Sequence, residues 1–200
     1  LIHGAHEWLD AYLLQARALG LTLPNWVEWL PLVLLTGSYL SLLAFALTSL
    51  QLVTQPRPRL LKLAIALVSL YFLLTLISIA FSWNKGIFGE EALEGLTRYV
   101  IAVPSSLLAA FGLHFIGVSA KTRSQSLVRF LNSASIGFGM YSLTHLFTSP
   151  MPMFPANILN EETFQSAVGF PIEIVWTCIA IWITLSLLRS LKESEQMRQT

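Results

Sequence analysis

Four stretches of the chain are each long and apolar enough to cross a lipid bilayer, and this feature limits the fold more than any other. They cover Trp26–Val53, Leu60–Phe81, Ala92–Val118 and Ile172–Leu191. A bilayer core about 30 Å thick requires about 20 predominantly apolar residues in an α-helix. Only 12% of the residues are charged, which is about half of the fraction in a soluble domain. The sequence therefore predicts an all-α, polytopic transmembrane bundle.

Two further segments extend this set to six spans. Leu127–Phe147 is more polar and contains Gly137 and Gly139; small and hydroxyl-bearing residues favour a helix packed among other helices. The opening segment, Leu1–Leu19, starts inside an apolar pattern. We therefore expect it to be a truncated first span, with a seventh helix before it in the parent protein.

Basic residues predict the orientation of the bundle. Alternate connections carry nine of the twelve basic residues, namely Arg57, Arg59, Lys62, Lys121, Arg123, Arg129, Arg189, Lys192 and Arg198. The intervening connections hold most of the acidic residues. Loops rich in Lys and Arg stay on the cytoplasmic side of a membrane. The pattern therefore predicts that these connections and the C-terminus are cytoplasmic, with residues 1–191 forming the bundle and the lipid bilayer as its solvent.

The last apolar helix continues past the membrane without a helix breaker. Its extension reads LLRSLKESEQMRQT, which contains good helix formers and neither Gly nor Pro. We interpret residues 192–200 as the start of a cytoplasmic signalling helix. Such a helix suits a sensor, because a sensor must pass a movement to an output module.

Three motifs resemble those of one bacterial family. They are HGAHEWLD near the start, TRYVIAVPSSLLAAFGL in the fourth span, and FPANILNEETFQSAVGFPIEIV before the last span. This family consists of multi-helix, seven-span sensory input regions that lie N-terminal to PAS, histidine kinase or diguanylate cyclase modules. The chain resembles these regions. Its corresponding patterns are HGxHEW, RYLLGLPGALLAA and FPA…LN…F…G.P. The resemblance covers most of the chain.

The resemblance implies a function and a location. The chain is expected to be the input domain of a homodimeric sensor in the bacterial inner membrane, with a kinase or cyclase output beyond Thr200. The chain itself has no kinase or cyclase motif, so we do not expect it to be an enzyme. Two departures stand out: VPSS replaces the usual LPGA, and Trp176 lies near a frequent arginine. The contact made by that arginine is expected to be absent or altered. A net charge of +1 gives no reason to expect a nucleic-acid partner.

Ionisable residues form a stripe on the opening helix. His3, His6, Glu7 and Asp10 follow the i, i+3, i+4, i+7 spacing of one helix face, with Trp8 beside them. Ionisable groups at membrane depth are costly unless they face the bundle interior and have partners. Three interpretations stay open: a buried hydrogen-bond network, a ligand or proton sensor, and a metal or haem site.

The metal interpretation uses His3, His6 and Glu7, since histidine is a common metal ligand. For a haem held by two imidazoles, His114 and His145 are further candidates, and we expect His114 to lie closer to the level of His3. Two functions therefore compete with the sensor: a b-type haem or metal-binding membrane protein, and a small transporter.

A long outer connection precedes the last span. We expect it to be a lid over the outer mouth of the bundle, in which Met151, Met153 and Phe154 contact an apolar ligand or the bilayer surface. Long ordered loops in compact domains are often functional. Asn157 and Asn160 are expected to cap or turn the backbone.

Overall fold

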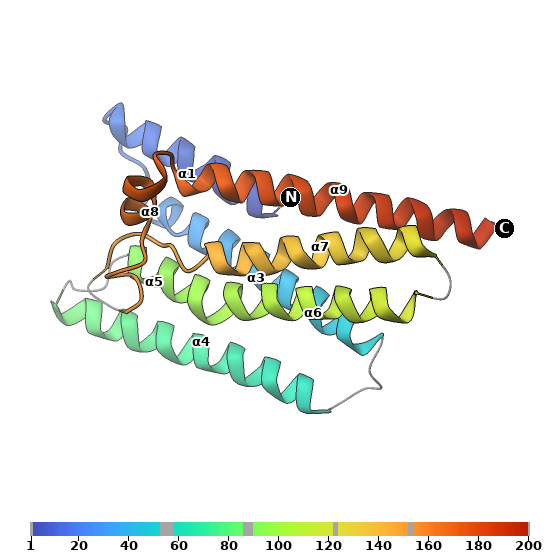
Figure 1. The fold of residues 1–200 in the computed structure, drawn as a ribbon. Coiled ribbons are helices and arrows are strands. Elements are labelled where there is room, and N and C mark those ends of the chain that lie inside the picture. Colours follow the sequence, from blue (N-terminus) through green and yellow to red (C-terminus); the bar gives the residue numbers. More distant parts are fainter. Residues whose placement is uncertain (1, 53–57, 86–89, 122–123, 152–153, 200) are drawn as a thin grey trace.

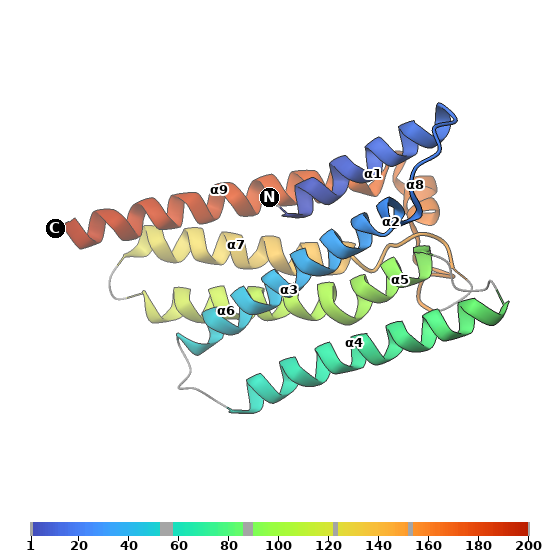
Figure 2. The same cartoon turned by 180° about the vertical axis from the view of Figure 1, so that it is seen from behind.

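The protein is an elongated bundle of helices lying side by side (Figures 1 and 2). The computed structural model describes residues 2–52, 58–85, 90–121, 124–151 and 154–199. All regular secondary structure in these ranges is helical. The elements are α1 (Ile2–Ala18), α2 (Asn25–Glu28), α3 (Leu30–Gln51), α4 (Pro58–Lys85), α5 (Glu90–Thr97), the π-helical turn η1 (Arg98–Ala102), α6 (Val103–Ser119), α7 (Gln125–Thr144), α8 (Glu161–Val168) and α9 (Ile172–Gln199).

Four helical segments are long and apolar enough to cross a membrane, judged by length and composition. They are Leu30–Gln51, Arg59–Ala80, Ala92–Ser119 and Ile172–Gln199. Each coincides closely with one of the four apolar stretches recognised in the sequence. Among the described residues, α1 and α7 do not meet this criterion. The all-helical prediction is therefore confirmed, and four of the six predicted spans have the length and hydropathy of a membrane helix.

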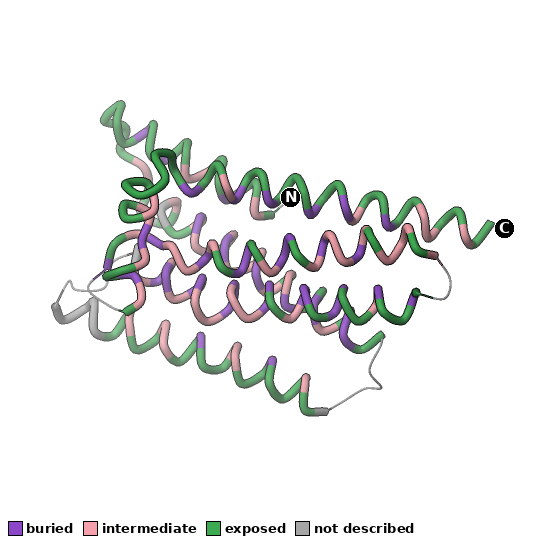
Figure 3. The backbone as a smooth tube through the Cα atoms, viewed as in Figure 1, coloured by how far each residue is buried: buried purple, intermediate pink, exposed green. Residues whose placement is uncertain are grey.

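The apolar core lies where α3, η1, α6, α7 and α9 meet. Its fully enclosed side chains include Leu35, Ile101 and Ile172. By contrast, α4 lies at one edge of the bundle, and most of its described residues are exposed (Figure 3). In a membrane protein this pattern is expected, because an apolar side chain gains little by leaving lipid for a protein core.

Small residues bring neighbouring helices close together. A Cβ atom on Gly137 of α7 would lie 2.6 Å from Cγ1 of Ile183 on α9. On α6, a Cβ atom on Gly112 would lie 2.8 Å from Cβ of Ser49 on α3. Both distances are too short for a real side chain. The two glycines therefore fix close approach of α7 to α9 and of α6 to α3.

Two prolines, Pro31 and Pro104, lie inside the apolar stretches, and each is accommodated by the local helix geometry. Pro31 lies in the first turn of α3, where its missing N–H costs no hydrogen bond. Pro31 therefore begins a new helix after the short α2 and does not interrupt one. Pro104 follows the π-helical turn η1. The wider turn accommodates the proline ring, which would clash with the carbonyl four residues earlier in a regular α-helix.

Chain direction places opposite charges at the two ends of the bundle (Figure 1). One end, which we call the basic end, contains the end of α3, the start of α4, the end of α6, the start of α7 and the end of α9. Its described basic residues are Arg59, Lys62, Lys121, Arg129, Arg189, Lys192 and Arg198. The other end, the acidic end, contains α5, α8 and the start of α9. Arg57 and Arg123 lie outside the described residues. The alternation of charge along the sequence thus becomes a separation in space.

Candidate functional site

The imidazole of His6 is held between a backbone carbonyl and a carboxylate. Its Nδ1 donates a hydrogen bond to the Pro31 carbonyl oxygen at 3.0 Å, and its Nε2 lies 3.2 Å from Oδ2 of Asp10. His6 is only 2% exposed. Both ring nitrogens therefore face oxygen atoms. His6 thus joins α1 to the start of α3 and to the carboxylate one turn later on its own helix.

His3 lies one turn earlier on the same face and points toward α7. Its Nε2 lies 3.0 Å from the Tyr141 hydroxyl and 3.5 Å from Oε1 of Glu7. The rings of His3 and His6 are stacked with their centroids 5.8 Å apart. The side chains of the stripe therefore contact one another, and His6 and His3 connect α1 to α3 and α7.

His145, at the end of α7, is enclosed by aromatic rings. It is 1% exposed, and its Nε2 lies 3.2 Å from the Tyr39 hydroxyl. The Tyr141 ring lies 4.2 Å away and the Trp176 ring 5.9 Å away, centroid to centroid. His145 thus connects the stripe of α1, through Tyr39 and Tyr141, to α9.

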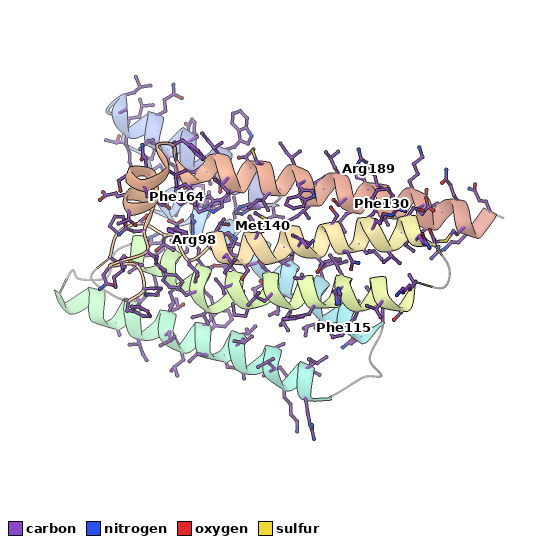
Figure 4. The ribbon with its side chains drawn as sticks, viewed as in Figure 1. Arg98, Phe115, Phe130, Met140, Phe164 and Arg189 are labelled. Atoms are coloured by element: carbon purple, nitrogen blue, oxygen red, sulfur yellow. The ribbon has the colours of Figure 1, made fainter. Side chains whose placement is uncertain are left out.

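A buried arginine completes this group of side chains. Arg98, in the π-helical turn η1, is 5% exposed, and its guanidinium carbon lies 4.3 Å from the centre of the Trp176 ring. It forms a hydrogen-bonded ion pair with Glu94. Nη1 also lies 4.0 Å from Oε1 of Glu161 on α8. Figure 4 shows Arg98 toward the end of the bundle that carries α8 and Phe164. We call the set His3, His6, Glu7, Asp10, Tyr39, Glu94, Arg98, Tyr141, His145 and Trp176 the polar cluster.

Glu161 connects the polar cluster to residues 154–171, which form a cap at the acidic end of the bundle. Burial raises the pKa of the Glu161 carboxyl to about 7, against the opposing attraction of the Arg98 guanidinium. At neutral pH this carboxyl is therefore close to half protonated. The ion pair between α8 and η1 is correspondingly incomplete.

Three members of the polar cluster keep polar atoms without a hydrogen-bond partner among the described residues. Nδ1 of His3, Nε and Nη1 of Arg98, and Nε1 of Trp176 are buried and accept or donate no hydrogen bond among the described residues. Buried polar atoms are normally paired, and each exception requires an explanation. The hydrogen-bonding capacity of the polar cluster is therefore not fully used within the described residues.

Two cavities adjoin the polar cluster on either side of α1. One has a volume of about 410 Å³ and is lined by His6, Glu7, Asp10 and Glu94 among others. The other has a volume of about 500 Å³ and lies between α1 and α9. Its polar lining residues are His3, Glu7, Tyr141, Glu173, Trp176, Thr177 and Thr184, and Ala180, Ile181 and Leu185 supply an apolar part of the wall. We call this second cavity the α1–α9 groove.

The structure separates the remaining candidates from this site. His114 is exposed on α6, with its Nδ1 3.2 Å from Oδ1 of Asn132. The expectation that His114 would lie closer than His145 to His3 is therefore wrong. The position of a residue along its own helix does not give its level in the bundle, because neighbouring helices are offset along their axes. Trp8 is 81% exposed and lies outside the polar cluster.

The connection between α7 and α9 folds against the acidic end of the bundle as a cap. Met151 is 8% exposed, and its side chain covers Gly95 of α5. Phe154 is 76% exposed. Asn160 caps α8: its side chain accepts a hydrogen bond from the Thr163 N–H at 2.8 Å. Asn157 lies exposed in the turn before that cap. Met153 lies outside the described residues.

The geometry gives the metal interpretation no support. Among the described residues, no group of three or more His, Cys, Asp and Glu side chains is arranged to hold a metal ion. The proposed ligands His3, His6 and Glu7 are instead engaged with Tyr141, Pro31 and one another.

Several functional candidates escaped sequence reasoning, namely Tyr39, Glu94, Arg98, Tyr141 and Glu161. Arg98 carried a usable signal, because an arginine inside an apolar stretch is costly and should have a partner. The tyrosines carried none: a hydroxyl group on an apolar helix does not show which way it faces. Comparison with family models, with curated proteins and with solved structures finds no match to this chain.

Proposed function

We propose that the chain is a membrane-embedded sensory input domain, which transmits a signal through α9 to a cytoplasmic output module beyond Thr200. The output is a histidine kinase or a diguanylate cyclase. In this proposal α1 and α7 cross the membrane together with the four more apolar segments. The membrane is the bacterial inner membrane, and the basic end of the bundle faces the cytoplasm, in keeping with the positive-inside rule.

One observation supports this proposal above the others: α9 connects the polar cluster, to which it contributes Trp176, with the basic end of the bundle. It runs without interruption from Ile172 to Gln199. Trp176, near the start of α9, contacts Arg98, and the final turns of α9 extend past the start of α7 at the basic end (Figure 1). A rigid helix of this kind converts a change of packing at one end into a displacement at the other.

The interface with α7 couples α9 to the rest of the bundle. Ser133 Oγ lies 3.0 Å from Ser186 Oγ and accepts a hydrogen bond from Trp182 Nε1 at 2.8 Å. Nearer the basic end, Glu193 accepts hydrogen bonds from Ser124 at 2.9 Å and Ser126 at 2.5 Å. These polar contacts flank the close apolar contact between Gly137 and Ile183, so α7 and α9 are held together along their length.

A signal acts in this scheme only through unequal affinity for two packings of the bundle. Because kinases and cyclases of this type work in pairs, we propose that the chain forms a homodimer through the α9 extension. The haem and transporter alternatives gain nothing from the geometry: His3, His6 and His145 are engaged with neighbouring side chains or backbone.

A fusion protein tests the proposal. The chain is joined after Thr200, in helical phase, to the dimeric catalytic core of a histidine kinase, and autophosphorylation is measured in membrane vesicles. Arg98→Gln alters the polar cluster and is expected to change the rate about 5-fold or more, the lower range of allosteric couplings. Arg189→Gln, on the exposed surface of α9, is the control and should leave the rate unchanged. Equal rates for the wild type and Arg98→Gln would contradict the proposal.

A further inference from the structure

An apolar groove of about 300 Å³ lies between α3 and the first half of α4. We call it the α3–α4 groove. Seven of its eight lining residues are apolar: three leucines and Ala44 on α3, and Ala64, Ile65 and Val68 on α4; the eighth is Ser69. A serine on a helix can bond its hydroxyl to the carbonyl one turn earlier. The groove therefore asks for no polar partner and suits a hydrocarbon chain.

The groove is open because α4 is attached to the bundle at few points. Among the described residues of α4, only Ala64 and Tyr71 are buried. The Tyr71 hydroxyl lies 2.9 Å from Oγ1 of Thr36 and 3.1 Å from Oγ1 of Thr97. Between this attachment and the start of α4, small side chains such as Ala64, and Ala44 across the groove, leave the space unfilled. An unfilled space forfeits dispersion contacts on both walls, so an acyl chain of the bilayer is expected to occupy it.

Two basic residues stand at the end of the groove that lies toward the basic end of the bundle. Lys62 precedes Ile65 by three residues and Ser69 by seven, so the three share one face of α4. Arg59 lies one turn before Lys62, and both are exposed. Their long apolar stems allow the charged groups to reach the membrane–water interface while the stems cover apolar surface. A molecule whose tail lies in the groove therefore has its head beside two cations.

These two cations require an anion from outside the described chain. The ion pairs of the described residues lie in α1, α5, η1 and α8, so Arg59 and Lys62 have no acidic partner among those residues. They are also the second and fifth residues of α4. The positive end of the helix dipole disfavours cations in the first turn and favours anions there.

The head and the tail of the expected occupant thus have different requirements. Lys and Arg are the side chains that bind phosphate, and basic groups beside a membrane helix attract anionic lipids. We propose that the α3–α4 groove binds one acyl chain of an anionic phospholipid, drawn from the leaflet at the basic end. The phosphate lies beside Arg59 and Lys62, and the chain runs between α3 and α4 toward Ser69, about 10 Å along α4 from Lys62.

This site goes beyond the proposed function and requires only that the apolar helices lie in a bilayer. Bound lipid would attach the first half of α4 to α3, where the protein itself provides few contacts. Binding is measured on the chain alone, without an output module. A failure of binding therefore overturns the lipid site, whereas transmission through α9 is judged separately by the kinase fusion.

The experiment titrates the full chain, in an uncharged detergent, with two phospholipids of identical acyl chains. They are phosphatidylglycerol, with an anionic head, and phosphatidylcholine, with a zwitterionic head; bound lipid is counted by native mass spectrometry. Each basic residue strengthens the attraction of an anionic head about 5-fold, so phosphatidylglycerol should bind about 10-fold or more tightly. Equal binding of the two lipids, or no binding, would overturn the proposal. A dimer that carries no lipid would assign the groove to a second copy of the chain and overturn it as well.

Two variants locate the lipid. Lys62→Gln should weaken phosphatidylglycerol binding about 5-fold. Its control is Lys192→Gln on α9, which lies across the bundle from α4 (Figures 1 and 2) and should leave binding unchanged. Ala44→Phe fills the groove from an exposed position of α3 and should weaken binding about 5-fold or more, the cost of overpacking an occupied site. Its control, Ala66→Phe, adds the same ring to α4 outside the groove and should have no effect. Wild-type binding by either Lys62→Gln or Ala44→Phe, or an equal loss in the matched control, would overturn the proposal.

Discussion

The guanidinium carbon of Arg98 lies 4.3 Å from the centre of the Trp176 ring, so a charged group on η1 rests on an aromatic face of α9. The same guanidinium pairs with Glu94 and lies 4.0 Å from Glu161. Contacts to α5, α8 and α9 therefore converge on one side chain. Arg98 is the link between the polar cluster and the helix proposed to carry the signal.

Replacing Arg98 should destabilise the bundle strongly. Arg98→Met leaves the Glu94 carboxylate partly buried without its counter-charge and removes the contact with Trp176. Removing one partner of a buried ion pair costs about 3 kcal/mol or more. The measurement is the free energy of unfolding in mixed micelles. The control, Arg189→Met, alters an exposed arginine of α9 and should change this free energy by less than about 0.5 kcal/mol. Equal losses for the two variants would contradict the assigned role of Arg98.

Docking of α8 should weaken as the pH rises through neutrality. Burial raises the pKa of Glu161 to about 7 in the folded protein, from an ordinary value of 4.5. The folded state therefore binds this proton more tightly than the unfolded state. The resulting contribution to stability is complete below pH 4.5 and is lost as the pH rises through about 7.

Hydrogen exchange of the α8 amides at about pH 5 and about pH 8, corrected for the intrinsic rate, measures this effect. Wild-type protection should be higher at the lower pH. Glu161→Gln should make protection nearly independent of pH, whereas Glu162→Gln, at the exposed neighbouring position, should behave as the wild type does. A pH dependence that survives in Glu161→Gln would assign the titration to another group.

Gly137 should tolerate no side chain in the α7–α9 interface. Gly137→Ala introduces a Cβ atom 2.6 Å from Cγ1 of Ile183, and overpacking of this kind costs about 1–3 kcal/mol. Gly139→Ala provides the control, because a Cβ atom there meets nothing within 4 Å; it should be neutral or stabilising by up to about 1 kcal/mol. Thermal unfolding measures both. Adding Ile183→Ala should make Gly137→Ala less costly than it is alone, and strict additivity would argue against the close approach.

The hydrogen bonds of Glu193 should hold the end of α9 against the start of α7. Glu193→Ala removes the acceptor shared by Ser124 and Ser126. Amide exchange in residues 191–199 should then accelerate, while exchange in α7 changes little beyond its first turn. Glu195→Ala alters an exposed acid on the same stretch and should leave exchange near the wild-type rate. Unchanged exchange in Glu193→Ala would show that the α9 extension is held by other contacts.

The spans were predictable from sequence because hydrophobic length is a local property. The bounds predicted for Ile172–Leu191 and Ala92–Val118 agree with α9 and with the segment from α5 to α6. The stripe of α1 was also predictable, since i, i+3, i+4 and i+7 positions share a face on any helix. His6 and Asp10 are indeed brought together.

The partners of that stripe were not predictable, because they depend on how helices are offset along one another. His145 and not His114 adjoins His3, and Tyr141 provides the contact. The π-helical turn at Arg98 changes which residues of that span face inward, and no periodicity in the sequence marks it. Pro104, six residues later, is the only local indication of it.

The most direct test of the central claim is the distance between the basic ends of α6 and α9. Spin labels at Ser119 and Glu195, introduced after Cys178→Ser, allow this distance to be measured by double electron–electron resonance in nanodiscs. If the polar cluster controls the position of α9, Arg98→Gln shifts the distance distribution, and Arg189→Gln leaves it as in the labelled parent. Identical distributions in all three proteins would contradict the account.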